Sequence, residues 1–138
     1  MWKCYALLSA LFAALTAIFA KAGVKDIPSN LATAIRTTVV LLLTWGIVFC
    51  CREEKAIKAA GCHTWGFLLL SGLATGLSWL FYFKALQTGE VSRVAPVDKL
   101  SVVITLLLAF LLLKEPVSPK VLIGALLITA GSVVMLWK

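Results

Sequence analysis

Three charged residues lie inside long apolar runs, where they cannot be explained as ordinary solvent-exposed surface charges. Arg36 comes six positions after Asn30, about 9 Å of helical rise into an apolar run. The run Leu100–Leu113 contains only 14 uncharged residues. A helix of that length spans roughly 21 Å, less than the ~30 Å hydrocarbon core of a bilayer, so Asp98 and Lys99 are expected inside the membrane boundary. Because a charge in a bilayer is costly, such residues by default mark the path of a polar solute or ion.

Two further cations extend this set into a layer. If successive apolar runs cross the membrane in alternating directions, Lys21 and Lys84 fall at the same membrane side as Arg36, Asp98 and Lys99. The layer then has four cations and one carboxylate, and the positive surplus favours an anionic or zwitterionic solute. The alternative for the cations, above all Lys21 and Lys84, is that they simply snorkel to lipid headgroups. Asp98 is too short to snorkel far, and we expect it to pair with Lys99 or Arg36.

Polar residues recur at helical spacing on two of the runs. Hydroxyl-bearing side chains follow one another at intervals of 4, 3 and 4 in the third run, and polar residues at intervals of 3 and 4 in the fourth. A polar face in a membrane bundle points to a cavity or to another helix, although each hydroxyl can instead bond to its own backbone. The candidate substrate-binding and gating residues are Arg36, Ser71, Thr75, Ser78, Trp79, Tyr82, Asp98, Lys99, Ser101 and Thr105.

The chain lacks the patterns of a metal site or an enzyme. The cysteines Cys4, Cys50, Cys51 and Cys62 form no CxxC pair, and His63 is the only histidine. No combination of nucleophile, base and orienting group is visible. We therefore expect no catalytic residues, no metal and no cofactor.

The elements that must position the candidate residues follow from composition. Of 138 residues, 62% are hydrophobic and 14% are charged, whereas a soluble domain is about half apolar and roughly a quarter charged. These values predict an all-α membrane protein with a single transmembrane domain, residues 1–138. The first run is too long for a signal peptide, and four more runs follow it. The predicted spans are Trp2–Ala20, Leu31–Cys50, Trp65 to about Leu86, a run ending at Leu113, and Val121–Trp137, with a short interfacial helix between Cys51 and Thr64.

The charge distribution bears on partners and topology. The net charge is +7, but the 13 lysines and arginines lie mainly at the ends of apolar runs, so lipid rather than nucleic acid is the expected partner. Alternating spans place six cations on the N-terminal side and seven on the other. Because the positive-inside rule orients a chain through a bias, insertion in both directions is predicted. The alternative is one orientation fixed by a few decisive loop charges.

Transporters are often built from inverted repeats, and no internal repeat is visible in this chain. The inverted half would then be a second molecule, which predicts an antiparallel homodimer. Gly124, Ala125 and Gly131 in the fifth span are small enough for close helix contact at a dimer interface, although packing within one chain would use the same residues.

The segments "LLSALFAALTAIFAKAG", "LATAIRTTVV" and "YFKALQTGEVSRVAPVDKLSVVITLLLAFLLLKEPVSPKVLIGALLITAGSVVML" resemble the EamA-like drug/metabolite transporter superfamily over nearly the whole chain. The chain is most similar to its small five-helix bacterial and archaeal branch. That resemblance implies one half of a ten-helix inverted-repeat fold in a prokaryotic plasma or inner membrane. It also implies a secondary transporter or exporter of a small metabolite that works by alternating access, and it points to the fifth span as a dimer contact.

One departure from the superfamily limits the mechanism. Small multidrug members carry a glutamate in the first helix for exchange of protons against cationic drugs, and Trp2–Ala20 contains no acid. Proton-coupled export of cations by that route is therefore not expected. Two other functions stay open: a flippase for a lipid-linked headgroup, and a non-transporting membrane subunit of a larger complex.

Overall fold

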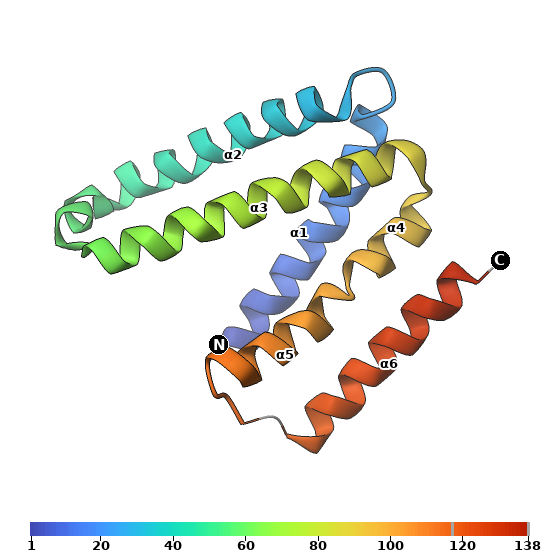
Figure 1. Ribbon diagram of the computed structural model, residues 1–138. Coiled ribbons are helices and arrows are strands. Elements are labelled where there is room, and N and C mark those ends of the chain that lie inside the picture. The colour runs from blue at the N-terminus through green and yellow to red at the C-terminus, as the bar shows by residue number, and fades with distance from the viewer. Residues whose placement is uncertain (117, 138) are drawn as a thin grey trace. The chain divides into compact units, whose positions relative to one another are not determined.

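The computed structural model describes residues 1–116 and 118–137, and within them the chain is helical apart from its connections. The chain divides into two compact units, Met1–Gln87 and Thr88–Lys138, each described below by itself (Figure 1). In chain order the elements are α1 (Trp2–Gly23), α2 (Ser29–Cys51), the 3₁₀ helix η1 (Glu53–Ala59), α3 (Cys62–Thr88), α4 (Val91–Asp98), α5 (Ser101–Leu112) and α6 (Pro119–Leu136).

Within the described residues, five helical segments are long and apolar enough to cross a bilayer, which confirms the predicted all-α membrane fold. The helices extend past the apolar runs, since α1 continues to Gly23 and α3 begins at Cys62. This is expected, because backbone hydrogen bonding does not stop where the apolar side chains do. Between the second and third spans, where a short interfacial helix was predicted, the chain forms the short helix η1.

The fourth span is not the single helix that was predicted. It runs from Val91 to Leu112 but is interrupted at Lys99 and Leu100, between α4 and α5. Pro96 lies inside α4, and proline removes one backbone donor and crowds the preceding turn. After it, the backbone N–H groups of Lys99 and Leu100 donate to residues three positions back, at 3.1 and 3.0 Å, as in a tightened 3₁₀ turn.

The first unit packs most closely at the end where α1 meets α2 and where α3 finishes. Val24, Ala32 and Phe83 form a small buried cluster there. Two side chains hold the same end together: Lys21 Nζ donates to the carbonyl of Leu86 at 2.6 Å, and Gln87 Nε2 donates to that of Ile27 at 3.2 Å. From this end α1 diverges from α2 and α3 (Figure 1), and residues 1–15 are all exposed.

The second unit is a hairpin in which α6 packs against both halves of the fourth span. Buried Ser132 donates its hydroxyl to the carbonyl of Pro96 at 2.9 Å, which links α6 to α4. Ala125 is buried on the same side of α6, one heptad earlier. The helix begins with Pro119 at its first turn, and the Ser118 side chain accepts a hydrogen bond from the Val121 N–H.

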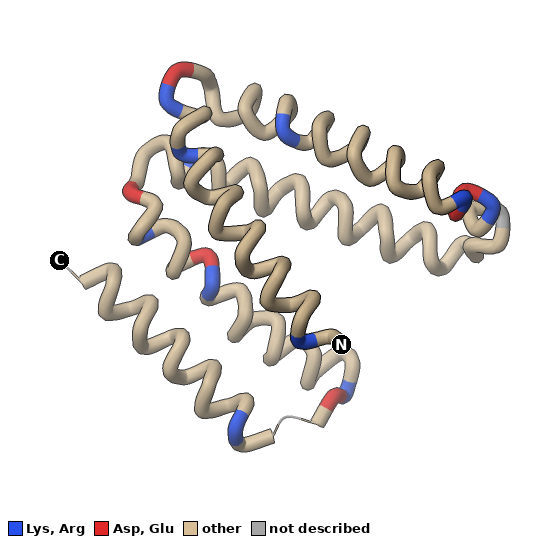
Figure 2. The backbone as a smooth tube through the Cα atoms, turned by 180° about the vertical axis from the view of Figure 1, so that it is seen from behind, with Lys and Arg blue, Asp and Glu red and all other residues tan. Residues whose placement is uncertain are grey.

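Charged side chains gather mostly at helix ends and connections, leaving long uncharged stretches between them (Figure 2). Most large apolar side chains on those stretches are exposed. Such a surface is unfavourable in water and suits lipid or another membrane helix.

Candidate functional site

Arg36 lies on α2 within the first unit and rests on two aromatic rings of α3. Its guanidinium carbon is 4.2 Å from the centroid of the Trp79 ring and 5.3 Å from that of Phe83. A cation over an aromatic face is stabilised by the ring quadrupole, most strongly over tryptophan and when water is excluded. Two of the predicted site residues, Arg36 and Trp79, are thus brought together.

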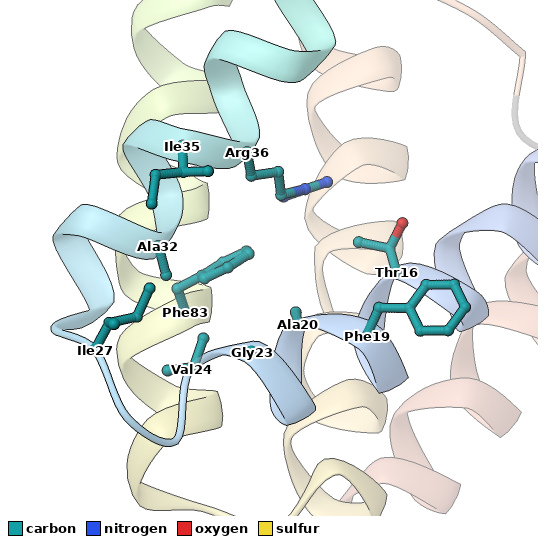
Figure 3. Close-up of a pocket in the computed structure, with 10 residues that line it drawn as sticks. All are labelled: Thr16, Phe19, Ala20, Gly23, Val24, Ile27, Ala32, Ile35, Arg36 and Phe83. Atoms are coloured by element: carbon teal, nitrogen blue, oxygen red, sulfur yellow. The ribbon is translucent and has the colours of Figure 1, made fainter.

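A cavity of about 370 Å³ lies beside this stack, between α1, α2 and the last turns of α3 (Figure 3). Arg36 is the only charged residue among the described residues that line it. Its α1 wall includes Thr16 and Phe19, which sequence reasoning missed because neither residue is charged or belongs to a polar stripe at helical spacing. The full lining is Thr16, Phe19, Ala20, Gly23, Val24, Ile27, Ala32, Ile35, Arg36 and Phe83.

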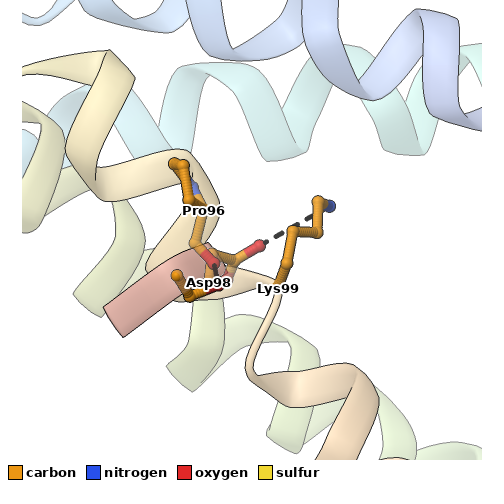
Figure 4. A network of polar contacts seen from close by, with 4 residues as sticks. Pro96, Asp98 and Lys99 are labelled. Carbon is orange, nitrogen blue, oxygen red and sulfur yellow. Dashed lines mark hydrogen bonds and ion pairs between the residues drawn. The ribbon is translucent and has the colours of Figure 1, made fainter. Parts of the chain in front are cut away.

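Asp98 and Lys99 form an ion pair where α4 ends, with 3.9 Å between Asp98 Oδ2 and Lys99 Nζ (Figure 4). The pair is loose and accessible, since 40% of the Asp98 side chain and 58% of the Lys99 side chain are exposed. Asp98 lies seven positions after Val91, about 10.5 Å of helical rise from the start of the span. Pairing of Asp98 with Lys99 is one of the two arrangements that the sequence predicted.

Lys99 also borders a hollow of about 450 Å³ between α4 and α6 in the second unit. Pro96, Gly131 and Ser132 share its wall. The carbonyl of Pro96 accepts both the Lys99 N–H and the Ser132 hydroxyl. The break in the fourth span is therefore held by a hydrogen bond from α6, and Lys99 next to it borders the open space between α4 and α6.

The residues of the predicted polar face of α3 differ in how exposed they are. Ser71, Thr75 and Ser78 are exposed, whereas Trp79 and Tyr82 are half-buried. The Thr75 hydroxyl donates to the Ser71 carbonyl at 2.8 Å, so that donor is satisfied within its own helix.

On the fourth span, the predicted stripe crosses the break instead of following one continuous helix. Asp98 ends α4, while Ser101 begins α5 and Thr105 lies one turn later. Ser101 and Thr105 are exposed. Their hydroxyls are available to an incoming solute or a second molecule.

Two cations of the predicted layer differ in their surroundings. Lys21 is half-buried and bonded to the Leu86 carbonyl, near the C-terminus of α3 where the helix dipole favours a cation. It ties α1 to α3. Lys84 is exposed on α3.

The small residues of α6 also occupy different positions. Ala125 is buried and lines a hollow with Val103 and Leu106 of α5 in its own chain. Gly124 and Gly131 are open: a methyl group added to either would meet no atom within 4 Å. Within one chain, then, Ala125 packs and the two glycines remain available.

The arrangement offers two features that can hold charged groups, the guanidinium of Arg36 over its aromatic rings and the ion pair of Asp98 with Lys99. The four cysteines are unpaired and exposed, and no cluster of three or more potential metal ligands occurs in residues 1–116 and 118–137. A stacked guanidinium and a loose ion pair both change partners without bond breaking.

Comparisons with known proteins identify the kind of protein that carries this arrangement. Residues 1–137 match the model of the EamA-like transporter family. An "uncharacterized transporter in cobO 3'region" from Sinorhizobium sp is 47% identical over 134 residues, which cover 97% of this chain and 95% of the relative. A "probable 4-amino-4-deoxy-L-arabinose-phosphoundecaprenol flippase subunit ArnE" from Enterobacter sp. (strain 638) is 31% identical over 85 residues, covering 62% of this chain and 79% of the relative.

No solved structure matches the chain. The family match covers all five spans and agrees with the resemblance seen in the sequence. It describes a multi-pass membrane transporter and not an enzyme. The chain belongs to the EamA-like transporter family.

Proposed function

We propose that two copies of this transporter pack antiparallel and carry a small anionic or zwitterionic metabolite by alternating access. The observation that supports this most strongly is the ion pair Asp98–Lys99 at the interruption of the fourth span. In many secondary transporters, discontinuous helices hold the substrate or the coupling ion near the middle of the membrane. A charged pair at such a break can likewise bind a charged substrate or a coupling ion.

The need for a second copy is supported by what one chain leaves uncovered. The polar groups Ser71, Thr75 and Ser78 lie on an exposed helix face. Polar groups are disfavoured against lipid and commonly face another helix. Gly124 and Gly131 give α6 an open surface for close helix contact.

Gating follows from the symmetry of such a pair. In an antiparallel dimer the two copies of Asp98 and Lys99 face opposite membrane surfaces, so one pair opens while the other closes. Lys99 attracts the anionic part of the solute at this break, and Arg36 offers a separate cation for the same kind of group within the first unit. Asp98 holds the cations in place between transport cycles or accepts a coupling proton.

A lipid-linked headgroup is a second candidate solute. It is favoured by the similarity to a protein named as a flippase subunit and by the exposed apolar surface beside the candidate cavity. The name of that relative also describes a subunit, which keeps a non-transporting role in a larger complex among the outcomes of the test.

Flux in proteoliposomes tests the proposal. The purified protein is reconstituted and offered matched anionic, zwitterionic and cationic solutes and, separately, a labelled lipid phosphate. We expect flux of an anionic or zwitterionic solute that Asp98→Asn or Lys99→Gln abolishes while the dimer persists on a sizing column. Lys120→Gln, which removes a cation at the start of α6, serves as the control with unchanged flux.

Three results would contradict the proposal. Normal flux in both variants would show that Asp98 and Lys99 only reach toward the lipid headgroups and play no part in transport. Movement of lipid alone would assign the flippase function. Absence of movement for every probe would indicate the non-transporting subunit.

A further inference from the structure

We propose that the cavity between α1, α2 and α3 binds an amphiphilic anion, with a phosphate or carboxylate at Arg36 and an apolar body against the remaining wall. The inference rests on the proposed function, because it names the substrate class of a transporter. It uses only residues of the first unit, and neither Asp98 nor Lys99 lines this cavity.

Arg36 is positioned to receive an anion. Its guanidinium carbon lies over the rings of Trp79 and Phe83, and these ring contacts do not use the hydrogen-bonding capacity of its N–H groups. Within residues 1–116 and 118–137, no carboxylate lies within 4.0 Å of it, since the ion pairs found join Arg93 to Glu90 and Lys99 to Asp98. A planar guanidinium binds carboxylate or phosphate oxygens in pairs, and does so more strongly where water is excluded.

Thr16 supplies a second polar group in the same cavity. Six threonines in the helices donate their hydroxyls to a carbonyl four positions back. The half-buried Thr16 hydroxyl makes no hydrogen bond in the described part of the chain. In Figure 3 this hydroxyl and the guanidinium of Arg36 lie on the same side of the cavity. An anion bound there would accept hydrogen bonds from both residues.

The rest of the wall determines what the anion is attached to. Val24, Ile27 and Phe83 are apolar, and so are the other lining residues apart from Arg36 and Thr16. A volume of about 370 Å³ lies within the roughly 300–1,000 Å³ of small-molecule sites. A free hydrated ion would leave that wall unfilled, whereas an anion with a short hydrocarbon or ring would bury it.

Binding of hexyl phosphate to the purified wild-type protein in detergent tests the inference without any flux measurement. Trp79 reports occupancy, because an anion that engages Arg36 changes the charge over its ring. We expect a saturable fluorescence change that Trp79→Phe removes. Phenylalanine retains an aromatic face for Arg36, so competition with radiolabelled hexyl phosphate should still detect binding in that variant.

Two substitutions at Arg36 separate charge from geometry. Arg36→Gln should weaken hexyl phosphate binding by about tenfold or more, because the charged hydrogen bonds are lost. Arg36→Lys keeps the charge but not the paired geometry and should give an intermediate affinity. Lys25→Gln removes an exposed cation from the α1–α2 loop and should leave binding unchanged. Circular dichroism confirms that each variant remains helical.

The other probes decide the ligand class and its source. Inorganic phosphate and hexyltrimethylammonium should bind much more weakly than hexyl phosphate, and equal binding of either one overturns the inference. Competition by dioleoyl phosphatidic acid assigns the anion to a lipid, and its failure assigns it to a soluble amphiphile. Equal affinity of wild type and Arg36→Gln also overturns the inference. This binding assay does not measure flux. A loss of flux in Asp98 variants therefore tests the proposed gate, and it does not test binding in this cavity.

Discussion

Ser132 is a buried hydroxyl whose hydrogen bond joins two helices of the second unit. Replacing it with alanine removes the 2.9 Å bond to the Pro96 carbonyl, which retains the Lys99 N–H as a donor. Because that carbonyl is not left unpaired, we expect the free energy of unfolding to fall by only about 0.5–1 kcal/mol. Unfolding in mixed micelles of increasing SDS content measures the change.

Ser101→Ala is the matched control for that prediction. Its hydroxyl is exposed in the same unit and makes no hydrogen bond in the described residues, so removing it should change stability little. An equal loss in both variants would show that the Ser132 bond contributes nothing specific.

The sequence pointed to individual site residues most clearly where a charged side chain lies in an apolar segment. Arg36 and Asp98 could be selected because a charge in an apolar run carries a known cost. Thr16 could not, because a threonine in a membrane helix usually bonds to its own backbone, as Thr75 does. Whether a hydroxyl is bonded depends on its rotamer and neighbours, which spacing along the chain does not specify.

Among the elements, the break between α4 and α5 is the one that we expect to matter for function. In Pro96→Ala, the restored N–H can donate to the Ser92 carbonyl, and the fourth span should become a more regular helix. One additional backbone bond should raise the free energy of unfolding by about 1 kcal/mol. Flux should fall several-fold, because Asp98 and Lys99 would then lie on a stiffer helix. Thermal unfolding and proteoliposome flux measure the two effects.

Pro119→Ala provides the comparison. Pro119 lies at the start of α6, where a backbone N–H has no partner within the helix, so its replacement should leave flux unchanged. Full flux in a stabilised Pro96→Ala protein would show that the break is not part of the transport cycle.

Helix positions were predictable from the sequence to within a few residues, because a bilayer of fixed thickness demands long apolar runs. The interruption at Lys99 was not predicted, although "APVDKL" contains a proline three positions before it. A proline in a membrane helix produces a bend, a break or neither, depending on which neighbouring group satisfies the freed carbonyls. Here α6 and the tightened turn decide the outcome, and both depend on packing.

At the scale of the whole molecule, the described part of one chain buries few side chains. Its largest fully buried side chains are Leu86 and Val24, and most of its large apolar residues are exposed. Lipid can cover apolar surface but not a polar face or a charged pair. We propose that a partner covers the exposed polar groups, and a second copy in the inverted orientation would supply the other half of the ten-helix fold that the family resemblance implies.

That arrangement requires the chain to insert in both directions. The six-to-seven division of lysines and arginines gives the positive-inside rule no preference to act on. Two reporters test this, one active only outside the cell and one active only inside it. Fused in turn to each terminus, both reporters should give a signal. Three lysines added next to Lys3 should collapse this to a single orientation and abolish flux, and co-expression with a chain carrying three lysines beside Lys25 should restore it. A strict single orientation of the unmodified chain would overturn the antiparallel dimer and leave a parallel assembly or another subunit as the partner.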